Sequence, residues 1–199
     1  MSDVVVVPTG TANLASVFAA FRRLGATPCL AERAGEIEGA IRVVVPGVGS
    51  FGAAMARLEA AGFVDALRSR LEAERPTLGF CVGLQVMFAS SDENPGAIGL
   101  GALPGNVGRF ADKVRVPQFG WNRIEPDPDC RLLQRGHAYF ANSYRVAQAP
   151  PGCVVAWAEH GGRFVAAFER GGILACQFHP ELSGAYGHGL LGRWLADGR

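Results

Sequence analysis

The stretch TLGFCVGLQ, residues 77–85, decides the fold. Its apolar first half is typical of a buried strand, and the G-x-C-x-G spacing from 79 to 83 matches the nucleophile elbow, a sharp strand-to-helix turn, with cysteine in the central position. The two glycines leave room for neighbouring backbone, so the turn presents Cys81 above the carboxyl edge of a sheet. A helix N-terminus at this point favours a thiolate. The alternative is a buried structural thiol, the usual state of a cysteine among apolar neighbours.

Outward from this corner, apolar runs alternate with segments of helical periodicity. The first half predicts buried strands at 3–8, 41–46 and 76–80 and helices at 13–25, 51–63, 63–74 and 82–89. The second half predicts strands at 121–124, 137–146, 154–159, 164–169 and 172–178, and then a helix at 184–196. We therefore expect an α/β fold, an open and mostly parallel twisted sheet flanked by helices, with antiparallel strands added in the C-terminal half and a single domain over residues 1–199.

Composition excludes several classes of protein. The 199 residues carry a formal net charge of +1 with scattered basic residues, so we expect no nucleic-acid or membrane partner. The first residues, MSDVVVVP, lack the basic segment of a secretory signal, and no apolar run is long enough to span a bilayer. The five cysteines form no CxxC pair, which argues against a disulfide framework and a metal site. A reducing, cytoplasmic location is expected.

A nucleophilic cysteine needs a base, and His179 has the most suitable setting of the four histidines. It ends the apolar strand in ILACQFHPELS, residues 173–183, whereas His137, His160 and His188 lie at a strand start, in a turn and in a glycine-rich run. Residues two apart in an extended chain project to the same side, so Glu181 is expected to orient the imidazole of His179. The alternative for Glu181 is an acid at the start of the last helix.

The glycine-rich loop PGVGSFG, residues 46–52, contains a formal G-x-G-x-x-G after a strand and before a helix, which is a dinucleotide-binding pattern. The next strand lacks the acidic residue that would hold a ribose, and it ends in Cys81 instead. We therefore expect no cofactor. The exposed amides of this loop are better placed to stabilise an oxyanion together with the Val82 N–H, and the second donor is either Val48 or Gly49.

Taken together, GFCVGLQ, PGVGSFGAAM and QFHPE resemble the class I, or triad, glutamine amidotransferases. The segments PTGTANLASV, VPGVGSFG, VPQFGWNRI, YFANSYRV and CQFHPELSG follow in the order typical of the glutaminase subunits of imidazole glycerol phosphate synthase, so the resemblance spans nearly the whole chain. PQFGWN, residues 117–122, is its most specific part, since other amidotransferases of the class share only the elbow and the HPE segment.

The resemblance implies hydrolysis of L-glutamine through a thioester, with release of glutamate and ammonia. Cys81 would be the nucleophile, His179 the base and Glu181 its orienter. The glutamine would be held by residues matched to the family pattern, namely Gln85, Glu93, Asn142, Ser143 and Tyr144. For Glu93, an exposed acid in a polar loop is the alternative.

The resemblance also implies a partner, a (β/α)8-barrel cyclase that receives the ammonia. The surface near Asn13, Ser16, Gln118, Trp121 and Asn122 would face it, although Asn13 and Ser16 could equally be a helix cap and a residue of the first turn.

Two departures from the family pattern stand out. Asn142 replaces a histidine, which puts communication between subunits in doubt, and Leu84 replaces a methionine of similar volume. Two alternative functions stay open from the residues alone. One is an amidotransferase subunit of another pathway, such as anthranilate synthesis, and the other is a non-catalytic α/β binding subunit.

Overall fold

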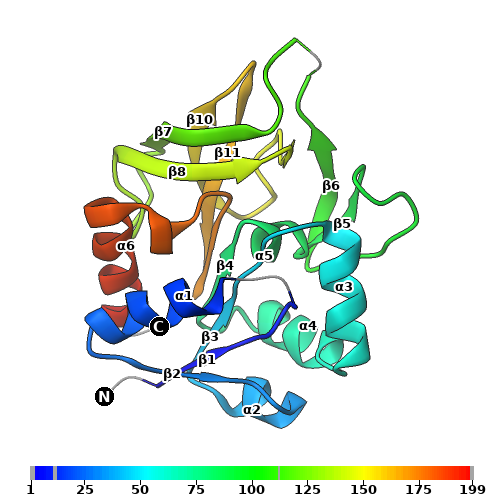
Figure 1. Ribbon diagram of the computed structural model, residues 1–199, viewed down its shortest axis with the longest axis vertical. Helices are drawn as coiled ribbons and strands as arrows, with labels where there is room; N and C mark the ends of the chain where they lie inside the picture. The colour runs from blue at the N-terminus through cyan, green and yellow to red at the C-terminus, as the bar shows by residue number, and fades with distance from the viewer. Residues whose placement is uncertain (1–2, 11–12, 112, 198–199) are drawn as a thin grey trace.

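A computed structural model describes residues 3–10, 13–111 and 113–197. Within these residues a nine-stranded sheet runs in the order β2-β1-β3-β4-β12-β11-β10-β7-β8. The strands from β2 to β12 in this order are parallel, and those from β12 to β8 are antiparallel. This mixed sheet, flanked by helices on both faces (Figure 1), confirms the expected fold class. The parallel strands are β1 (Asp3–Val6), β2 (Thr27–Leu30), β3 (Arg42–Val45), β4 (Thr77–Phe80) and β12 (Ile173–Cys176).

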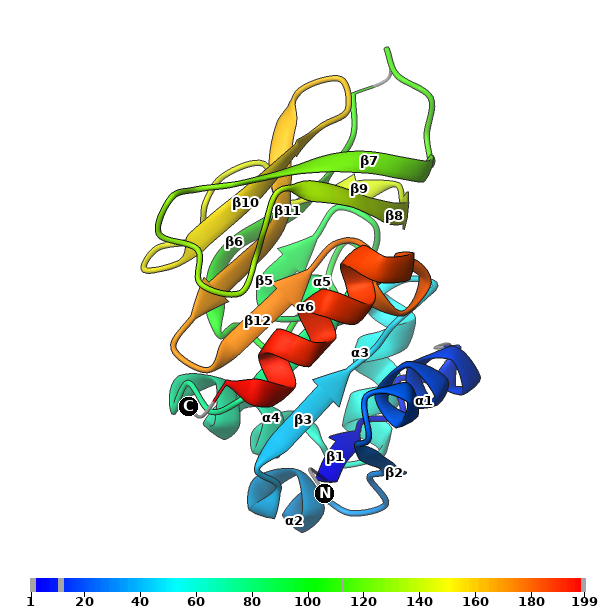
Figure 2. The same cartoon turned by 90° about the vertical axis from the view of Figure 1, so that its left-hand side faces the viewer.

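The antiparallel half begins at β12 and ends in a long hairpin. Its strands are β7 (Gln118–Pro126), β8 (Gly136–Asn142), β10 (Val154–Glu159) and β11 (Arg163–Arg170). The hairpin β7–β8 lies across the end of the molecule away from β1 and β2 (Figure 2). A smaller sheet of β5 (Phe88–Ser91), β6 (Leu103–Arg109) and β9 (Tyr144–Arg145) lies beside it.

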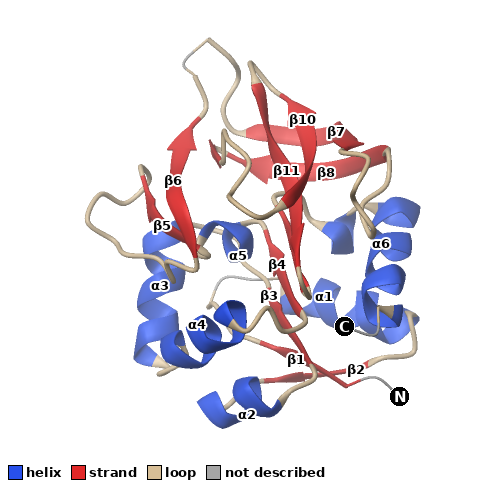
Figure 3. Ribbon diagram, turned by 180° about the vertical axis from the view of Figure 1, so that it is seen from behind, coloured by secondary structure: helices blue, strands red, loops and turns tan. Residues whose placement is uncertain are grey.

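The helices cover both faces of the parallel strands. Figure 3 shows α3 and α4 on one side of these strands and α1 and α6 on the other. The bounds are α1 (Leu14–Arg23), α2 (Ala34–Gly39), α3 (Phe51–Ala60), α4 (Val64–Glu72), α5 (Val82–Gln85), the 3-10 turn η1 (Pro180–Leu182) and α6 (Gly184–Ala196). Among the described residues, no helix is both long enough and apolar enough to cross a bilayer.

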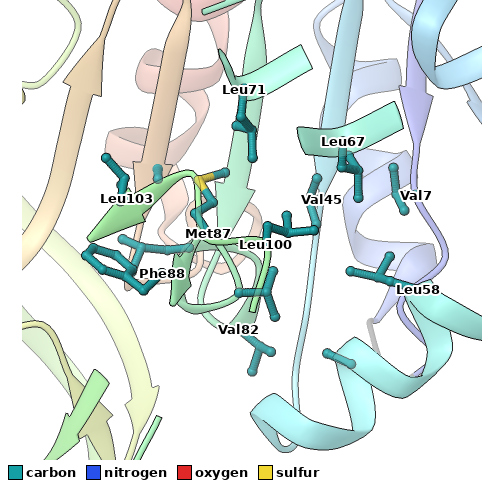
Figure 4. Packing of buried hydrophobic residues seen from close by; sticks show 14 of the residues in the cluster. Val7, Val45, Leu58, Leu67, Leu71, Val82, Met87, Phe88, Leu100 and Leu103 are labelled. Atoms are coloured by element: carbon teal, nitrogen blue, oxygen red, sulfur yellow. The ribbon is translucent and has the colours of Figure 1, made fainter. Parts of the chain in front are cut away.

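Each face of the sheet has its own apolar core, because side chains of a strand alternate between its two faces. In β3, Val43 and Val45 pack in the cluster that includes α3 and α4 (Figure 4), whereas Val44 packs in the cluster with α1 and α6. All three valines are buried. Burial on both faces explains why this strand is a continuous β-branched run.

Arg70 links α4 by hydrogen bonds to the chain around the starts of β3 and β4. It projects from α4, is 1% exposed, and its Nε donates to Thr77 Oγ1 at 3.1 Å. Its other nitrogens donate to backbone carbonyls of Ile37, Ala40, Ile41 and Pro76. Burial, together with the charge of Arg75, lowers the pKa of Arg70 to about 10. The guanidinium thus donates hydrogen bonds to five oxygens near the starts of β3 and β4, which would otherwise need water as a donor.

Two element predictions are wrong. The helix expected at 82–89 ends at Gln85, and Phe88–Ser91 forms β5, because pairing with β6 outweighs the local helical pattern. The strand expected at 137–146 breaks at Ser143, where the chain leaves the large sheet and Tyr144–Arg145 pairs with β6 instead. The pattern also missed β2, α2, β5 and β6.

Candidate active site

Cys81 lies on the corner between β4 and α5 in a strained backbone conformation. Its φ of 50° and ψ of −105° are rare for a residue with a side chain and match a nucleophile elbow. The Cys81 N–H donates to the Cys176 carbonyl at 2.7 Å, which anchors the corner to β12. A Cβ on Gly83 would collide with the Val45 carbonyl oxygen, so only glycine lets β3 pass this closely.

The helix after Cys81 is shorter than the sequence predicts, which weakens the stabilisation of a thiolate expected from its dipole. Because α5 is a single turn of four residues, its dipole gives a thiolate little support. The positive charge must come from a side chain, and the imidazole of His179, which lines the same cavity as Cys81, is the group that interacts with the thiol. Burial alone would lower the pKa of His179, but the hydrogen bonds and charges of Cys81 and Glu181 outweigh it and raise the pKa to about 10.

The imidazole of His179 is held from behind by Glu181. The Nδ1 atom lies 2.9 Å from Oε1 of Glu181, and the two side chains are 3% and 4% exposed. The expected pairing is present, but the reason given from strand alternation is wrong. The strand β12 ends at Cys176, and Glu181 lies in the 3-10 turn η1, which curls its carboxylate back onto the ring. With Nδ1 bonded to the carboxylate, Nε2 is left to face sulfur.

Ser183 fixes this turn. Its Oγ donates to the His179 carbonyl at 2.6 Å and accepts from the Tyr139 N–H at 3.0 Å. The His179 N–H in turn donates to the Tyr139 carbonyl at 2.9 Å. The orientation of the imidazole is therefore set by β8 as well as by its own segment.

Two buried glutamine side chains, Gln85 and Gln177, form a series of hydrogen bonds that ends at the sulfur of Cys81. Gln177 Nε2 donates to Cys81 Sγ at 3.6 Å, and Gln85 Nε2 donates to Gln177 Oε1 at 3.1 Å. Gln177 is fully buried and was missed in the sequence analysis. Its position two residues before His179 at the end of an apolar strand was the available signal.

One cavity of about 150 Å³ gathers nearly all the predicted site residues. Glu181 does not line it, because it lies behind His179. The lining residues are Val48, Gly49, Cys81, Val82, Gln85, Glu93, Ala141, Asn142, Ser143, Tyr144 and His179.

Glu93 is half-buried and not a freely exposed loop acid. Its Oε2 accepts from the Phe51 N–H at 2.7 Å, and Asn94 Oδ1 accepts from the Gly52 N–H at 2.8 Å. Both side chains thus cap the first turn of α3, together with Ser50. The carboxylate of Glu93 lies between the start of this helix and the cavity, where it can attract a positively charged ligand group.

The Val82 N–H, the expected oxyanion donor, is already engaged. It donates to the Gly47 carbonyl at 3.4 Å, so a peptide oxygen of the glycine-rich loop faces it. A Cβ on Gly47 would come within 2.8 Å of the Val82 Cβ, and Gly49 has a φ of 90°, which favours glycine. Val48 and Gly49 line the cavity beside this contact.

Asn142 is 4% exposed and lines the cavity with one side-chain atom lacking a partner. Its Nδ2 donates to the Tyr144 carbonyl at 2.9 Å, while Oδ1 has no hydrogen-bond partner among the residues described. An oxygen of this kind can accept a hydrogen bond from a ligand N–H.

The other three histidines lie apart from this cavity. His137 and His188 are exposed, and His160 binds the Arg115 carbonyl through Nε2 at 2.8 Å and packs edge-on against Phe110. Residues 3–10, 13–111 and 113–197 contain no cluster of three or more His, Cys, Asp or Glu suited to a metal ion.

Comparison with known proteins gives the family. The pattern of the family Glutamine amidotransferase class-I matches residues 27–195. The imidazole glycerol phosphate synthase subunit HisH of Symbiobacterium thermophilum is 38% identical over 98% of this chain and 93% of its own length. The chain belongs to the HisH family of class-I glutamine amidotransferases. The HisH subunit of Xylella fastidiosa is 41% identical, and the match covers 98% of each chain.

Two further similarities are informative about architecture. The chloroplastic imidazole glycerol phosphate synthase hisHF of Arabidopsis thaliana is 38% identical over 98% of this chain, which covers only 34% of that longer protein. A crystal structure of a glutamine amidotransferase superposes with a TM-score of 0.77 at 24% identity, covering 96% of both chains. The fold described above is thus that of the class-I amidotransferases.

Proposed function

We propose that this chain, acting as a single domain, is the glutaminase subunit of an imidazole glycerol phosphate synthase and supplies ammonia to a cyclase partner in histidine biosynthesis. Membership in the HisH family supports the pathway. The observation that carries the chemistry is the position of Cys81 on a positive-φ corner, in one cavity with the imidazole of His179, which is itself held by Glu181. This arrangement is typical of thiol-based acyl transfer.

In the proposed reaction, the Cys81 thiolate attacks the side-chain amide carbon of glutamine and forms a C–S bond. The imidazolium of His179 then gives its proton to the leaving nitrogen as the C–N bond breaks, which releases ammonia and leaves a thioester. His179, now neutral, takes a proton from water, and the resulting hydroxide attacks the thioester. The C–S bond breaks, and glutamate and the thiolate are regenerated.

The tetrahedral intermediates in these steps carry an oxyanion that needs N–H donors. Val82 can provide one only after its N–H leaves the Gly47 carbonyl. We therefore propose that the peptide between Gly47 and Val48 turns during the catalytic cycle, so that its N–H and that of Val82 both face the oxyanion. Gly49 remains the alternative second donor. Activity of the chain alone is accordingly expected to be low.

The glutamine would lie in the cavity with its ammonium group against Glu93. Gln85, Asn142, Ser143 and Tyr144 would hold the rest of the amino-acid end. The unpartnered Oδ1 of Asn142 supports this assignment, since an ammonium or amide N–H of the substrate would satisfy it.

The proposed partner is a (β/α)8-barrel cyclase, and an exposed apolar surface on the β7–β8 hairpin is where it would dock. Phe119 and Trp121 are 70% and 59% exposed, and the ring of Tyr139 contacts both. Leu182 of η1, which contacts β8, is a further large apolar side chain that is 42% exposed. Of the other residues expected at this surface, Gln118 is buried, and Asn13 caps α1 by accepting from the Ser16 N–H at 3.2 Å. We propose a cytoplasmic location, where both subunits would meet.

Labelling with 6-diazo-5-oxo-L-norleucine, a glutamine analogue with an electrophilic carbon, tests the chemistry. We expect one adduct per chain on Cys81 and none in Cys81→Ser. A chain that takes no label even when the cyclase and its nucleotide are present would be a binding subunit and not a glutaminase. Capture of a partner other than a barrel cyclase would favour an amidotransferase of another pathway.

A further inference from the structure

The proposed mechanism gives no role to Oε2, the second carboxylate oxygen of Glu181. Oε1 binds His179, but Oε2 is buried and has no hydrogen-bond partner within the described part of the chain. A buried carboxylate oxygen without a donor is costly, because the carboxylate has lost its water on that side. Some group of opposite charge or a hydrogen-bond donor is therefore needed behind Glu181.

A second cavity, of about 220 Å³, is lined by Glu181. It is separate from the cavity around Cys81, and Glu181 lines only this one. Its walls include Arg23 from the last turn of α1 and His188 from α6. The apolar side chains of Ala20 and Leu191 complete the walls between these two helices.

Arg23 is the only positively charged side chain among those lining this second cavity, and it is uncommitted. The described residues give Arg23 no hydrogen bond and no ion pair, whereas its neighbour Arg22 lies over the Phe18 ring at 5.6 Å. His188 likewise has no described partner. A guanidinium and an imidazole without partners thus line the same small cavity as Glu181, one of whose carboxylate oxygens has no partner.

We propose that Arg23, with His188 beside it, holds Oε2 of Glu181 across this cavity and is a positioning residue for the Glu181–His179 pair. The inference rests on the proposed glutaminase function. A guanidinium beside a carboxylate favours its ionised form and fixes its orientation through charge-assisted hydrogen bonds. Glu181 would then be clamped at both oxygens, with His179 on one and Arg23 on the other.

The remaining groups near Glu181 cannot do the same. On β12 the neighbour is the buried thiol of Cys176, and the Glu181 charge contributes to raising its pKa well above the usual value, although burial is the larger cause. On η1 itself Pro180 and Leu182 carry no charge. Among the residues that line this cavity, those that can carry a positive charge come from α1 and α6.

The test compares Arg23→Met with Arg22→Met, two equal changes at adjacent exposed positions of α1. The readouts are the rate of Cys81 labelling by 6-diazo-5-oxo-L-norleucine as a function of pH and the glutaminase kinetics of the complex with its cyclase. For Arg23→Met we expect labelling at pH 7 to fall about tenfold, with the acid limb of the profile moved to higher pH and with kcat lowered at constant KM. Arg22→Met should resemble the wild type.

Two further variants separate charge from shape. Arg23→Lys keeps the charge and should recover at least about half of the wild-type rate, and His188→Asn combined with Arg23→Met should lower labelling by about a further twofold. Equal profiles for Arg23→Met and Arg22→Met, or no recovery in Arg23→Lys, would overturn the positioning role. Failure of the wild-type chain to take label at all would instead refute the proposed function.

Discussion

The charge of Glu181 is expected to control both the reactivity and the stability of the site, and Glu181→Gln removes it with little change in shape. The pKa of His179 is raised from 6.5 to about 10 by its hydrogen bonds and charge interactions with Cys81 and Glu181, against the opposing effect of burial. This rise corresponds to about 5 kcal/mol of preference for the imidazolium in the folded protein. Glu181 is one of its two partners, so we assign it about 2 kcal/mol, which lies within the range for a hydrogen bond between charged groups.

The variant should therefore have a His179 pKa of about 8.5. Because the folded-state pKa lies above the unfolded value of 6.5, the stabilisation is complete below pH 6.5 and is lost as the pH rises through about 10 in the wild type. In Glu181→Gln it is lost as the pH rises through about 8.5. The free energy of unfolding should thus be about 2 kcal/mol lower in the variant near pH 7, and the two proteins should converge near pH 10.

Urea denaturation at pH 7 and at pH 10 measures this difference. In parallel, the alkaline limb of kcat/KM for glutamine in the complex should move about 1.5 pH units lower in the variant. An equal loss of stability at both pH values, with an unmoved alkaline limb, would refute the reasoning. The role of Glu181 would then be packing alone.

Three further outcomes are expected. Cys81→Ala should abolish glutamine-dependent synthesis by the complex but leave synthesis from added ammonia intact, and loss of both would contradict the assignment of roles. Arg70→Met should lower the free energy of unfolding by about 3 to 5 kcal/mol in urea, because five oxygens lose their donor, whereas the half-exposed Arg68→Met should cost about 1 kcal/mol. Trp121→Ala should weaken binding of the cyclase about 30-fold by calorimetry, and Ile41→Ala, which changes an apolar residue of similar exposure directly before β3 and away from the β7–β8 hairpin, should not.

The sequence was sufficient for features that depend on local pattern. The β-branched run of β3 predicted burial on both faces, and the G-x-C-x-G spacing predicted the corner at Cys81. Asn13 and Ser50 mark true helix starts, since each side chain accepts from a backbone N–H three residues on. These features need no knowledge of distant segments.

Features that depend on distant partners could not be predicted in the same way. Phe88–Ser91 is a strand only because β6 pairs with it, and the chain breaks at Ser143 because Tyr144 pairs with the small sheet. The pairing of His179 with Glu181 was expected for the wrong reason, since a 3-10 turn and not an extended strand joins them. The direction of the Gly47 carbonyl depends on the orientation of a single peptide plane. A glycine-rich loop permits either orientation, so the sequence alone does not determine it.

The β7–β8 hairpin carries both an exposed apolar surface and part of the wall of the cavity around Cys81. Phe119 stands directly opposite Ala141 in the strand pairing, and the Ala141 carbonyl lies 3.9 Å from Sγ of Cys81. A protein that binds at Phe119 and displaces β7 would therefore also displace Ala141 on the paired strand β8, next to the sulfur of Cys81. A displacement of β7 would move β8 directly, because the two strands are joined by backbone hydrogen bonds. No series of side-chain rearrangements through the interior would be needed.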